Sequence, residues 1–314
     1  MSSLRQLRGL RRRQRGNSGQ SKPPTITPPT PELIASFISN HNTQEHSPLF
    51  NQIPPEIRNT IFLYALLSYE DLSTVYPEDE HYSRPDYRHT SRIDPRILQT
   101  CRLIYLESRF LPVMATEHVF WCHRAPPGIT YASNPLEYFA RFTEEQKNRV
   151  DRVHFFTQQY YLEGDFPEIC KLPSMRPRSL KITLRHGDWW WWEDNHPLHL
   201  NDVWSTGSDY STRLEEVILE LETMERDKEQ IYAIAERIKK YTHTLNNGKT
   251  LSTAGNPIVK KEWMGPSRLS DLYYDKARDK WTERDLEAEQ GVPDPGMKYC
   301  IVVIRWTICP EEEE

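Results

Sequence analysis

Four consecutive tryptophans, Trp189–Trp192, are the feature of this 314-residue chain with the clearest capacity to bind another molecule. An exposed group of indoles is costly unless it binds something or packs under a loop. Such rings can form a hot spot for a peptide or ligand, or stack on a sugar. The alternative is structural: two indoles cover a sheet edge, and two lie flat against His196-Pro197-Leu198. The sequence leaves both interpretations open.

Metal chemistry has one candidate group in the sequence, His118, Cys122 and His123. Cys122 and His123 are adjacent, so on a strand they would point to opposite faces. No second pair of ligands has the spacing of a zinc site. We therefore predict no metal and no cofactor, and we expect the five cysteines to be small core residues in a reducing compartment.

Motifs for common catalytic chemistry are not found in the sequence. It contains no G-x-S-x-G, no H-E-x-x-H, no P-loop and no G-x-G-x-x-G. Acidic residues are plentiful, but spacing alone singles out no catalytic pair. We therefore expect a binding protein and not an enzyme.

Charge is distributed unevenly along the chain. Residues 1–31 hold six Arg and one Lys with no acidic residue, and the remainder carries 33 basic and 45 acidic residues, a formal balance of −12. An acidic body argues against nucleic-acid binding, which needs a basic face. The longest apolar run, near Ile61–Tyr69, is far shorter than the about 20 residues of a membrane helix. No nucleic-acid or membrane partner is expected.

The basic N-terminal arm has three interpretations. It could carry a nuclear localisation patch, and the leucines interleaved with its arginines could instead mark a mitochondrial presequence. It could also be a solvated tail. The protein is expected in the cytoplasm or the nucleus, with the mitochondrial alternative left open. The residues of the patch are Arg11, Arg12, Arg13 and Arg15.

Composition and periodicity divide the chain into four parts. Residues 1–45, basic and then rich in proline, are predicted to be disordered. Residues 46–125 show helical periodicity, and residues 126–310 change to the period of strands. Residues 311–314 form an acidic tail that we expect to be solvated.

Two helices are predicted in the first ordered part. Pro55 can occupy the first turn of one, since its missing N–H costs nothing there. Ile57, Ile61, Ala65 and Leu66 then share one face. The second helix begins at Asp94-Pro95, a cap residue followed by proline, and its apolar residues continue at helical spacing to Leu111.

Alternation of apolar and polar residues predicts strands in the second part. The clearest is Leu214–Glu222, where we expect Leu219 and Leu221 in the core and Glu220 exposed. A helix is predicted near residues 226–242, and a central strand at Tyr299–Ile308, which is apolar on both faces. Two further strands are predicted around Val153 and Ile182, and short helices are predicted to begin at Asn134-Pro135 and Thr143. A tight turn is predicted at Asn247-Gly248, and residues 274–296 are expected to form an exposed polar segment.

Phe50–Phe62 followed by Ile97–Tyr105 resembles the F-box-like module that begins many ascomycete fungal proteins. The resemblance extends to residues 118–121, 188–193 and 214–222, and covers residues 50 to about 308. It implies docking to the Skp-type adaptor of a cullin–RING ubiquitin ligase. The residues that would contact the adaptor are Ile53, Pro54, Ile57 and Ile61.

One departure from the F-box pattern bears on this interpretation. True F-boxes join their two helices tightly, whereas residues 68–93 intervene here and are rich in tyrosine, proline and charge. This insertion could obstruct the adaptor surface.

We expect an α+β fold, in which an N-terminal F-box-like helical module packs on a small mixed β-sheet with covering helices. The expected function is that of an intracellular protein-interaction module. In its sharpest form, the module docks a Skp-type adaptor and the sheet region presents an unknown protein substrate for ubiquitination. The alternatives are a scaffold without adaptor binding and a small-molecule-binding protein that uses Trp189–Trp192.

Overall fold

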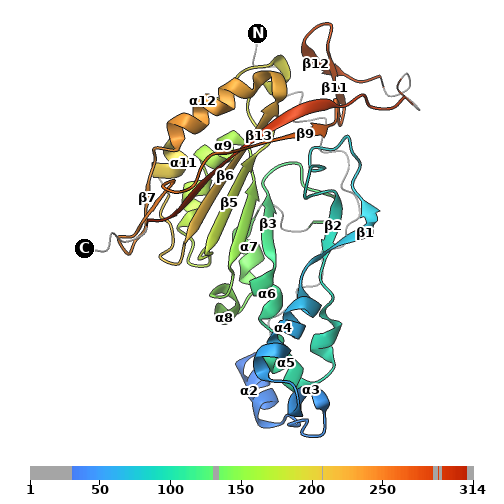
Figure 1. The fold of residues 1–314 in the computed structure, drawn as a ribbon, viewed down its shortest axis with the longest axis vertical. Helices are drawn as coiled ribbons and strands as arrows, with labels where there is room; N and C mark the ends of the chain where they lie inside the picture. The colour runs from blue at the N-terminus through green and yellow to red at the C-terminus, as the bar shows by residue number, and fades with distance from the viewer. Residues whose placement is uncertain (1–29, 130–133, 207, 286–288, 290–291, 310–314) are drawn as a thin grey trace.

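The computed structural model describes residues 30–129, 134–206, 208–285, 289 and 292–309. Figure 1 shows a twisted sheet with helices beside it and a separate group of helices extending from one end. The architecture is therefore mixed α/β, and of the predicted α+β fold the combination of helices with a mixed sheet is confirmed. The localisation patch at Arg11–Arg15 and the acidic tail lie outside the described residues.

The sheet combines a parallel half with an antiparallel half. Four parallel strands lie side by side in chain order, and β13 then pairs antiparallel with the last of them. Beyond β13 lie β9 and β8, each antiparallel to it, and β7 pairs with β8. These eight strands make a larger sheet than the small one that we predicted. The strands are β3 (Glu117–Trp121), β4 (Arg152–Phe156), β5 (Ser179–Leu184), β6 (Glu216–Met224), β7 (His243–Thr244), β8 (Thr250–Ser252), β9 (Val259–Gly265) and β13 (Met297–Ile308).

Several predicted elements are confirmed. β13 lies between β6 and the β8–β9 side of the sheet, so it is central as expected. The turn at Asn247-Gly248 joins β7 to β8, with Gly248 at a φ of 81°. The helix predicted near residues 226–242 is α12 (Lys228–Ile238), and Thr143 forms the predicted capping box.

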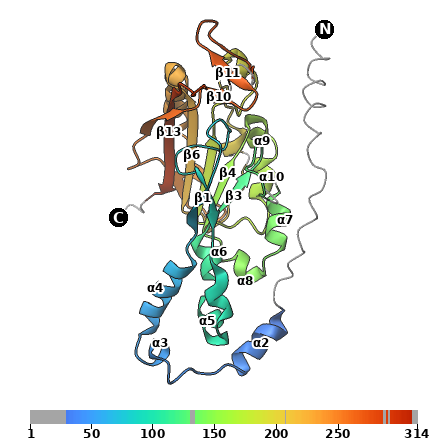
Figure 2. The same ribbon diagram turned by 90° about the vertical axis from the view of Figure 1, so that its right-hand side faces the viewer.

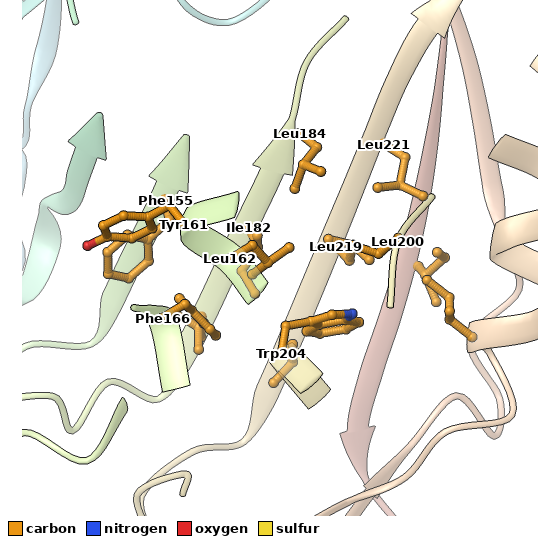
Figure 3. Close-up of a cluster of buried hydrophobic side chains, with 14 of the residues drawn as sticks. Phe155, Tyr161, Leu162, Phe166, Ile182, Leu184, Leu200, Trp204, Leu219 and Leu221 are labelled. Atoms are coloured by element: carbon orange, nitrogen blue, oxygen red, sulfur yellow. The ribbon is translucent and has the colours of Figure 1, made fainter. Parts of the chain in front are cut away.

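Helices bury one face of the sheet. Alternate residues of each strand point into this core, including Phe155, Ile182, Leu219 and Leu221, and Trp204 is fully buried against them (Figure 3). Apolar alternation therefore identified this face correctly. The helices are α7 (Pro135–Ala140), α8 (Glu144–Lys147), α9 (Gln159–Glu163), α10 (Phe166–Cys170), α11 (Val203–Thr206) and α12.

The second group of helices extends away from the sheet (Figure 2). The prediction of disorder to about residue 45 is wrong for α2, which Thr30 caps and whose Phe37 packs edge-on against Tyr105. The second predicted helix is divided, because a 3-10 turn ends before Cys101 and a new helix follows. The elements are α2 (Pro31–Ser39), α3 (Pro48–Asn51), α4 (Pro55–Leu66), the 3-10 turn Pro95–Gln99, α5 (Arg102–Ser108) and α6 (Leu111–Ala115).

The inserted segment is a ribbon with a long tip, here called the excursion (residues 69–92). β1 (Tyr69–Val75) and β2 (His89–Arg92) pair antiparallel, and residues 76–88 between them pack on the second face of the sheet. Tyr82 and Tyr87 of the tip pack with Trp121 and Phe156 of the sheet. The excursion therefore joins the helical part to the sheet.

A small three-stranded sheet corrects the prediction for residues 274–296. Within this stretch Tyr274 and Trp281 are buried, and the Trp281 ring lies 5.2 Å from that of Trp192. The strands are β10 (Arg268–Leu269), β11 (Leu272–Asp275) and β12 (Lys280–Glu283). Across the part of the chain that is described, no helix combines the length and apolarity needed to cross a membrane.

Candidate functional site

Helix α4 carries Ile57 and Ile61, two of the four residues that the resemblance assigned to an adaptor, and Ile53 and Pro54 precede it. Its buried face consists of Arg58, Phe62 and Leu66, whereas Ile57 is 52% exposed and Ile61 is 41% exposed. The Arg58 guanidinium donates to both carboxylate oxygens of Glu107 at 2.8 and 3.1 Å, which fastens α4 to α5. An arginine thus occupies the inner face, and the isoleucines predicted to share a face with Leu66 point outward.

Ile57, Ile61 and Tyr64 are spaced by four and three residues, so they share the outer face of α4. Pro54 is exposed just before the helix, and Ile53 is half-buried. The apolar exposure continues directly into β1. We call this the α4–β1 surface, formed by Ile57, Ile61, Tyr64, Tyr69, Leu72 and Val75, all of them exposed.

The excursion does not cover the two isoleucines, contrary to the obstruction that the sequence suggested. Its tip packs on the sheet, and Ile57 and Ile61 keep their exposure. The outer face of α4 is therefore accessible in this structure.

The tryptophan run divides into two pairs. Trp189 and Trp192 are buried, whereas Trp190 is 59% exposed and Trp191 is 54% exposed. Trp189 Nε1 donates to the carbonyl of His196 at 2.8 Å. The inner pair is therefore part of the packed interior, whereas more than half of the surface of each outer ring is exposed.

The inner pair surrounds a buried histidine. The ring of His186 lies 5.3 Å from that of Trp189 and 5.2 Å from that of Trp192, and Trp281 and Tyr299 complete the enclosure. Burial, together with the positive charges of Arg226 and Arg124, lowers the pKa of His186 to about 3. The imidazole is neutral near pH 7 and serves as part of an aromatic core.

Glu220 corrects the clearest residue-level prediction from the sequence. It was expected to be exposed, but only 8% of its surface is accessible. Its carboxylate accepts a hydrogen bond from Thr183 at 2.9 Å and pairs with Lys181 at 3.0 Å. Arg84, from the tip of the excursion, packs over this carboxylate, and its Nη2 lies 3.7 Å from Oε2 of Glu220. The charged face of β6 is therefore enclosed by a segment remote in sequence.

These contacts continue across the parallel strands as one polar network. The Tyr87 hydroxyl donates to Glu117 at 2.7 Å and lies 2.7 Å from Nδ1 of His154. The other ring nitrogen of His154 lies 2.8 Å from the Thr183 hydroxyl, which in turn donates to Glu220. Four adjacent strands are thus connected by side-chain contacts under the excursion.

Burial and charge act on the acids of this network in opposite directions. Burial disfavours ionisation of Glu220, but the charges of Arg84 and Lys181 outweigh it and lower its pKa. Burial dominates at Glu222 and raises its pKa, although Arg84 lies 3.4 Å away. Glu220 is therefore ionised at neutral pH.

Arg84 is positioned by a tight turn. The Tyr87 N–H donates to the Arg84 carbonyl at 2.9 Å, with Pro85 and Asp86 at the two central positions and Asp86 at a φ of 70°. Proline first and positive φ second are the signature of a type II turn. One signal in the sequence could have predicted that this charged face is enclosed. Oppositely charged residues stand at alternate positions of neighbouring strands, as Lys181 and Glu220 do.

A cavity of about 410 Å³ lies between the excursion and the end of β9. Its walls include Tyr76, Arg84 and Arg88 from the excursion, and Trp263 and Met264 from β9. A cavity of this volume falls within the about 300–1,000 Å³ of small-molecule sites. Sequence reasoning missed it because its walls are separated by about 190 residues.

The candidate metal group is not assembled as a site. His118 uses both ring nitrogens, at 2.8 Å from the Tyr138 hydroxyl and 2.9 Å from the Val113 carbonyl. Burial raises the pKa of the Cys122 thiol to about 12. Among the residues with described positions, no three His, Cys, Asp or Glu side chains gather closely enough to hold a metal ion.

Comparison with known proteins found no matching family model, no matching curated protein and no matching solved structure. Function is therefore inferred from the resemblance noted in the sequence and from the geometry of these surfaces.

Proposed function

We propose that this chain is a protein-interaction protein that docks a partner on the α4–β1 surface. The observation that carries the proposal is that three exposed apolar residues, Ile57, Ile61 and Tyr64, share the outer face of α4, with three more exposed apolar residues following in β1. Exposed apolar residues that occur singly are ordinary, but grouped ones mark interaction sites. The buried contacts of Arg58 and Phe62 hold α4 so that its outer face is presented without rearrangement.

The partner that we propose is a Skp-type adaptor, with the sheet region presenting a protein substrate for ubiquitination. The resemblance to F-box-like proteins supports this choice, and so does the exposure of Pro54, Ile57 and Ile61 at the positions it assigns to the adaptor. Ile53 is half-buried, so it would contribute less than the other three. A scaffold that keeps this fold but binds no adaptor is the alternative.

Direct titration of the purified chain with purified Skp-type adaptor tests the proposal. A double substitution, Ile57→Ala with Ile61→Ala, should weaken binding by at least about tenfold, because central apolar anchors dominate such interfaces. The matched control is Trp190→Ala, which removes an equally exposed apolar side chain elsewhere and should leave the affinity unchanged.

A Kd of about 100 μM corresponds to a binding free energy of only about −5.5 kcal/mol. If the wild-type chain shows no binding at this adaptor concentration, the ligase proposal is contradicted and the scaffold is favoured. Equal loss of affinity in the Trp190→Ala control would show that the loss is not specific to the outer face of α4 and would contradict docking at that face alone.

Small-molecule binding is a second candidate, favoured by the cavity beside Arg84. The recess next to Trp190 measures only about 40 Å³, whereas the cavity between the excursion and β9 measures about 410 Å³. Native mass spectrometry of the purified chain tests this candidate. A bound metabolite lost on Met264→Trp, which narrows the cavity, would support it, and an unliganded mass before and after that change would contradict it.

A further inference from the structure

Three exposed aromatic side chains lie in the segments that follow the carboxyl ends of β4 and β5. We call Tyr160, Trp190 and Trp191 the aromatic platform. The Tyr160 and Trp190 rings lie 5.9 Å apart, inclined at 38°, and a recess of about 40 Å³ opens beside them. Tyr160 is itself about half exposed. This platform is separate from the α4–β1 surface, so binding here is independent of the proposed function.

The loop that carries the two tryptophans is held firmly. The carbonyl of Trp191 accepts from the N–H groups of Asp194 at 3.1 Å and His196 at 3.0 Å. Trp191 itself has a φ of 62°, a costly conformation for a bulky residue. The buried rings of Trp189 and Trp192 anchor the loop from below. Trp190 and Trp191 are therefore presented in a fixed position, which lowers the entropic cost of binding.

The two segments that carry the platform, residues 157–170 and 188–202, are acidic in composition, with seven acidic residues and no Arg or Lys. Cations from just outside these segments pair with two of the acids, Arg185 with Asp188 at 2.8 Å and Lys171 with Glu168 at 2.7 Å. The balance stays negative. Aromatic faces set among carboxylates favour a cationic ligand, because the ring quadrupole and the acids attract positive charge together.

The chain itself contains a segment of matching chemistry. Residues 1–22 hold six Arg and one Lys with no acid, and they lie outside the described residues. Arg15 and Arg11 lie 15 and 19 residues before Thr30, so an extended chain can place them up to about 50–60 Å from it. Thr30 caps α2, in the helical group that extends from the sheet (Figure 2). The patch can therefore reach well beyond α2 towards the sheet.

We propose that the basic N-terminal arm of this chain docks on the aromatic platform, with arginine guanidinium groups over the faces of Trp190 and Trp191. Arginine suits such a site better than lysine, because its planar group stacks on an indole. Docking would cover the patch Arg11–Arg15, so the platform acts as a mask for the localisation signal and releases it when the arm is displaced.

Limited trypsin digestion of the full chain, followed by mass spectrometry, tests the proposal. If the arm binds the platform with a Kd of about 0.2 mM and its effective concentration is about 1 mM, the undocked fraction of the arm falls to about one sixth. Trypsin would then cleave the arm about six times more slowly than an undocked arm. Cleavage after Arg11, Arg12 and Arg13 should therefore accelerate about sixfold in a Trp190→Ala, Trp191→Ala variant. The matched control is the Ile57→Ala, Ile61→Ala variant, which should keep the wild-type rate.

Salt and protein concentration separate the alternatives. Raising the salt to about 0.5 M, where the Debye length falls to about 4 Å, should also accelerate cleavage in the wild-type chain. A rate independent of protein concentration indicates docking within one molecule, whereas protection that grows with concentration would overturn that arrangement in favour of a second copy. Equal cleavage rates in the wild type and the tryptophan variant would overturn the proposal.

A second measurement leaves the tryptophans intact, in case their double substitution disturbs the loop. Oxidative footprinting of Trp190 and Trp191 is compared between the wild-type chain and an Arg11→Ser, Arg12→Ser, Arg13→Ser variant. Oxidation should rise about threefold or more in that variant, because the docked arm no longer shields the rings. Unchanged oxidation would contradict docking.

Discussion

The two faces of the central sheet are both buried, but by opposite chemistry. On one face the helices cover Leu219 and its apolar neighbours. On the other face the excursion covers Glu220 and its charged neighbours, with Arg84 and Tyr87 supplying the complementary groups. Adjacent residues of one strand, Leu219 and Glu220, thus enter two different interiors.

The difference shows that alternating apolar residues predict which face of a strand is buried, whereas alternating charged residues do not predict whether their face is exposed. An apolar row on a strand must be buried, because exposing it forfeits the hydrophobic free energy. A charged row can be solvated or enclosed, and enclosure requires paired charges and hydrogen bonds from elsewhere. Here those partners come from residues 84 and 87, about 130 positions before Glu220.

The largest expected effect comes from removing the cation over the charged face. Arg84→Ala leaves the carboxylates of Glu220 and Glu222 without their shared partner, so we expect a loss of about 3–5 kcal/mol of unfolding free energy. The matched control, Arg88→Ala, removes an exposed arginine of the same excursion and should cost under about 0.5 kcal/mol. Denaturant unfolding measures both, and equal midpoints would mean that the excursion does not seal this face.

Adjacent positions of β6 sharpen the comparison directly. Leu219→Ala should cost about 2–5 kcal/mol through loss of buried contacts and the cavity left behind. Glu220→Ala should cost about 1.5–3 kcal/mol, because it removes hydrogen bonds to a charged group. The same unfolding measurement applies. A loss under about 0.5 kcal/mol for Glu220→Ala would restore the exposed position expected from the sequence alone.

The acids of the charged face should give opposite pH dependences. The folded-state pKa of Glu220 lies below its ordinary 4.5, so the stability it provides is present above pH 4.5 and is lost as the pH falls through the folded value. The folded-state pKa of Glu222 lies above 4.5, so its contribution is present below pH 4.5 and is lost as the pH rises through the folded value.

Stability curves from about pH 3 to 8 test these signs. Glu220→Gln should reduce the fall in stability on the acidic side, and Glu222→Gln should reduce the fall above about pH 4.5, each by about 1.4 kcal/mol for every unit of pKa difference. Identical curves for the wild type and both variants would show that neither acid is perturbed by folding.

The smallest effect is expected on the outer face of α4. Ile61→Ala should change the unfolding free energy by under about 0.5 kcal/mol, because the side chain is exposed. The adjacent Phe62 is fully buried, and Phe62→Ala should cost about 3–5 kcal/mol. A thermal melt of the two variants separates them, and a large loss for Ile61→Ala would mean that this face packs inside the protein.

Prediction from the sequence succeeded where local chemistry decides the outcome. Proline in the first turn places the start of α4, and Thr143 with Gln146 specifies a capping box. The run of apolar residues in β13 requires burial on both faces and hence a central place in the sheet. These features depend on residues within a few positions of one another.

The same reasoning failed where an arginine replaced an apolar contact. The inner face of α4 contains Arg58, which is paired with Glu107 across 49 positions, and Leu66 lies on this buried face and not with the exposed Ile57 and Ile61, with which the sequence grouped it. The division of the tryptophan run into two pairs has a similar origin, since Trp281, 89 positions further along the chain, packs against Trp192.

The sequence by itself determined the class of fold and the apolar face of each main strand, because these follow from local periodicity and residue type. Only the tertiary structure decided which polar residues are buried, which isoleucines stay exposed and where the cavities lie. The physical reason is that hydrophobic burial is non-directional and is recorded in each segment's own pattern. Burial of charge is specific, and its partners are known only once distant segments are brought together.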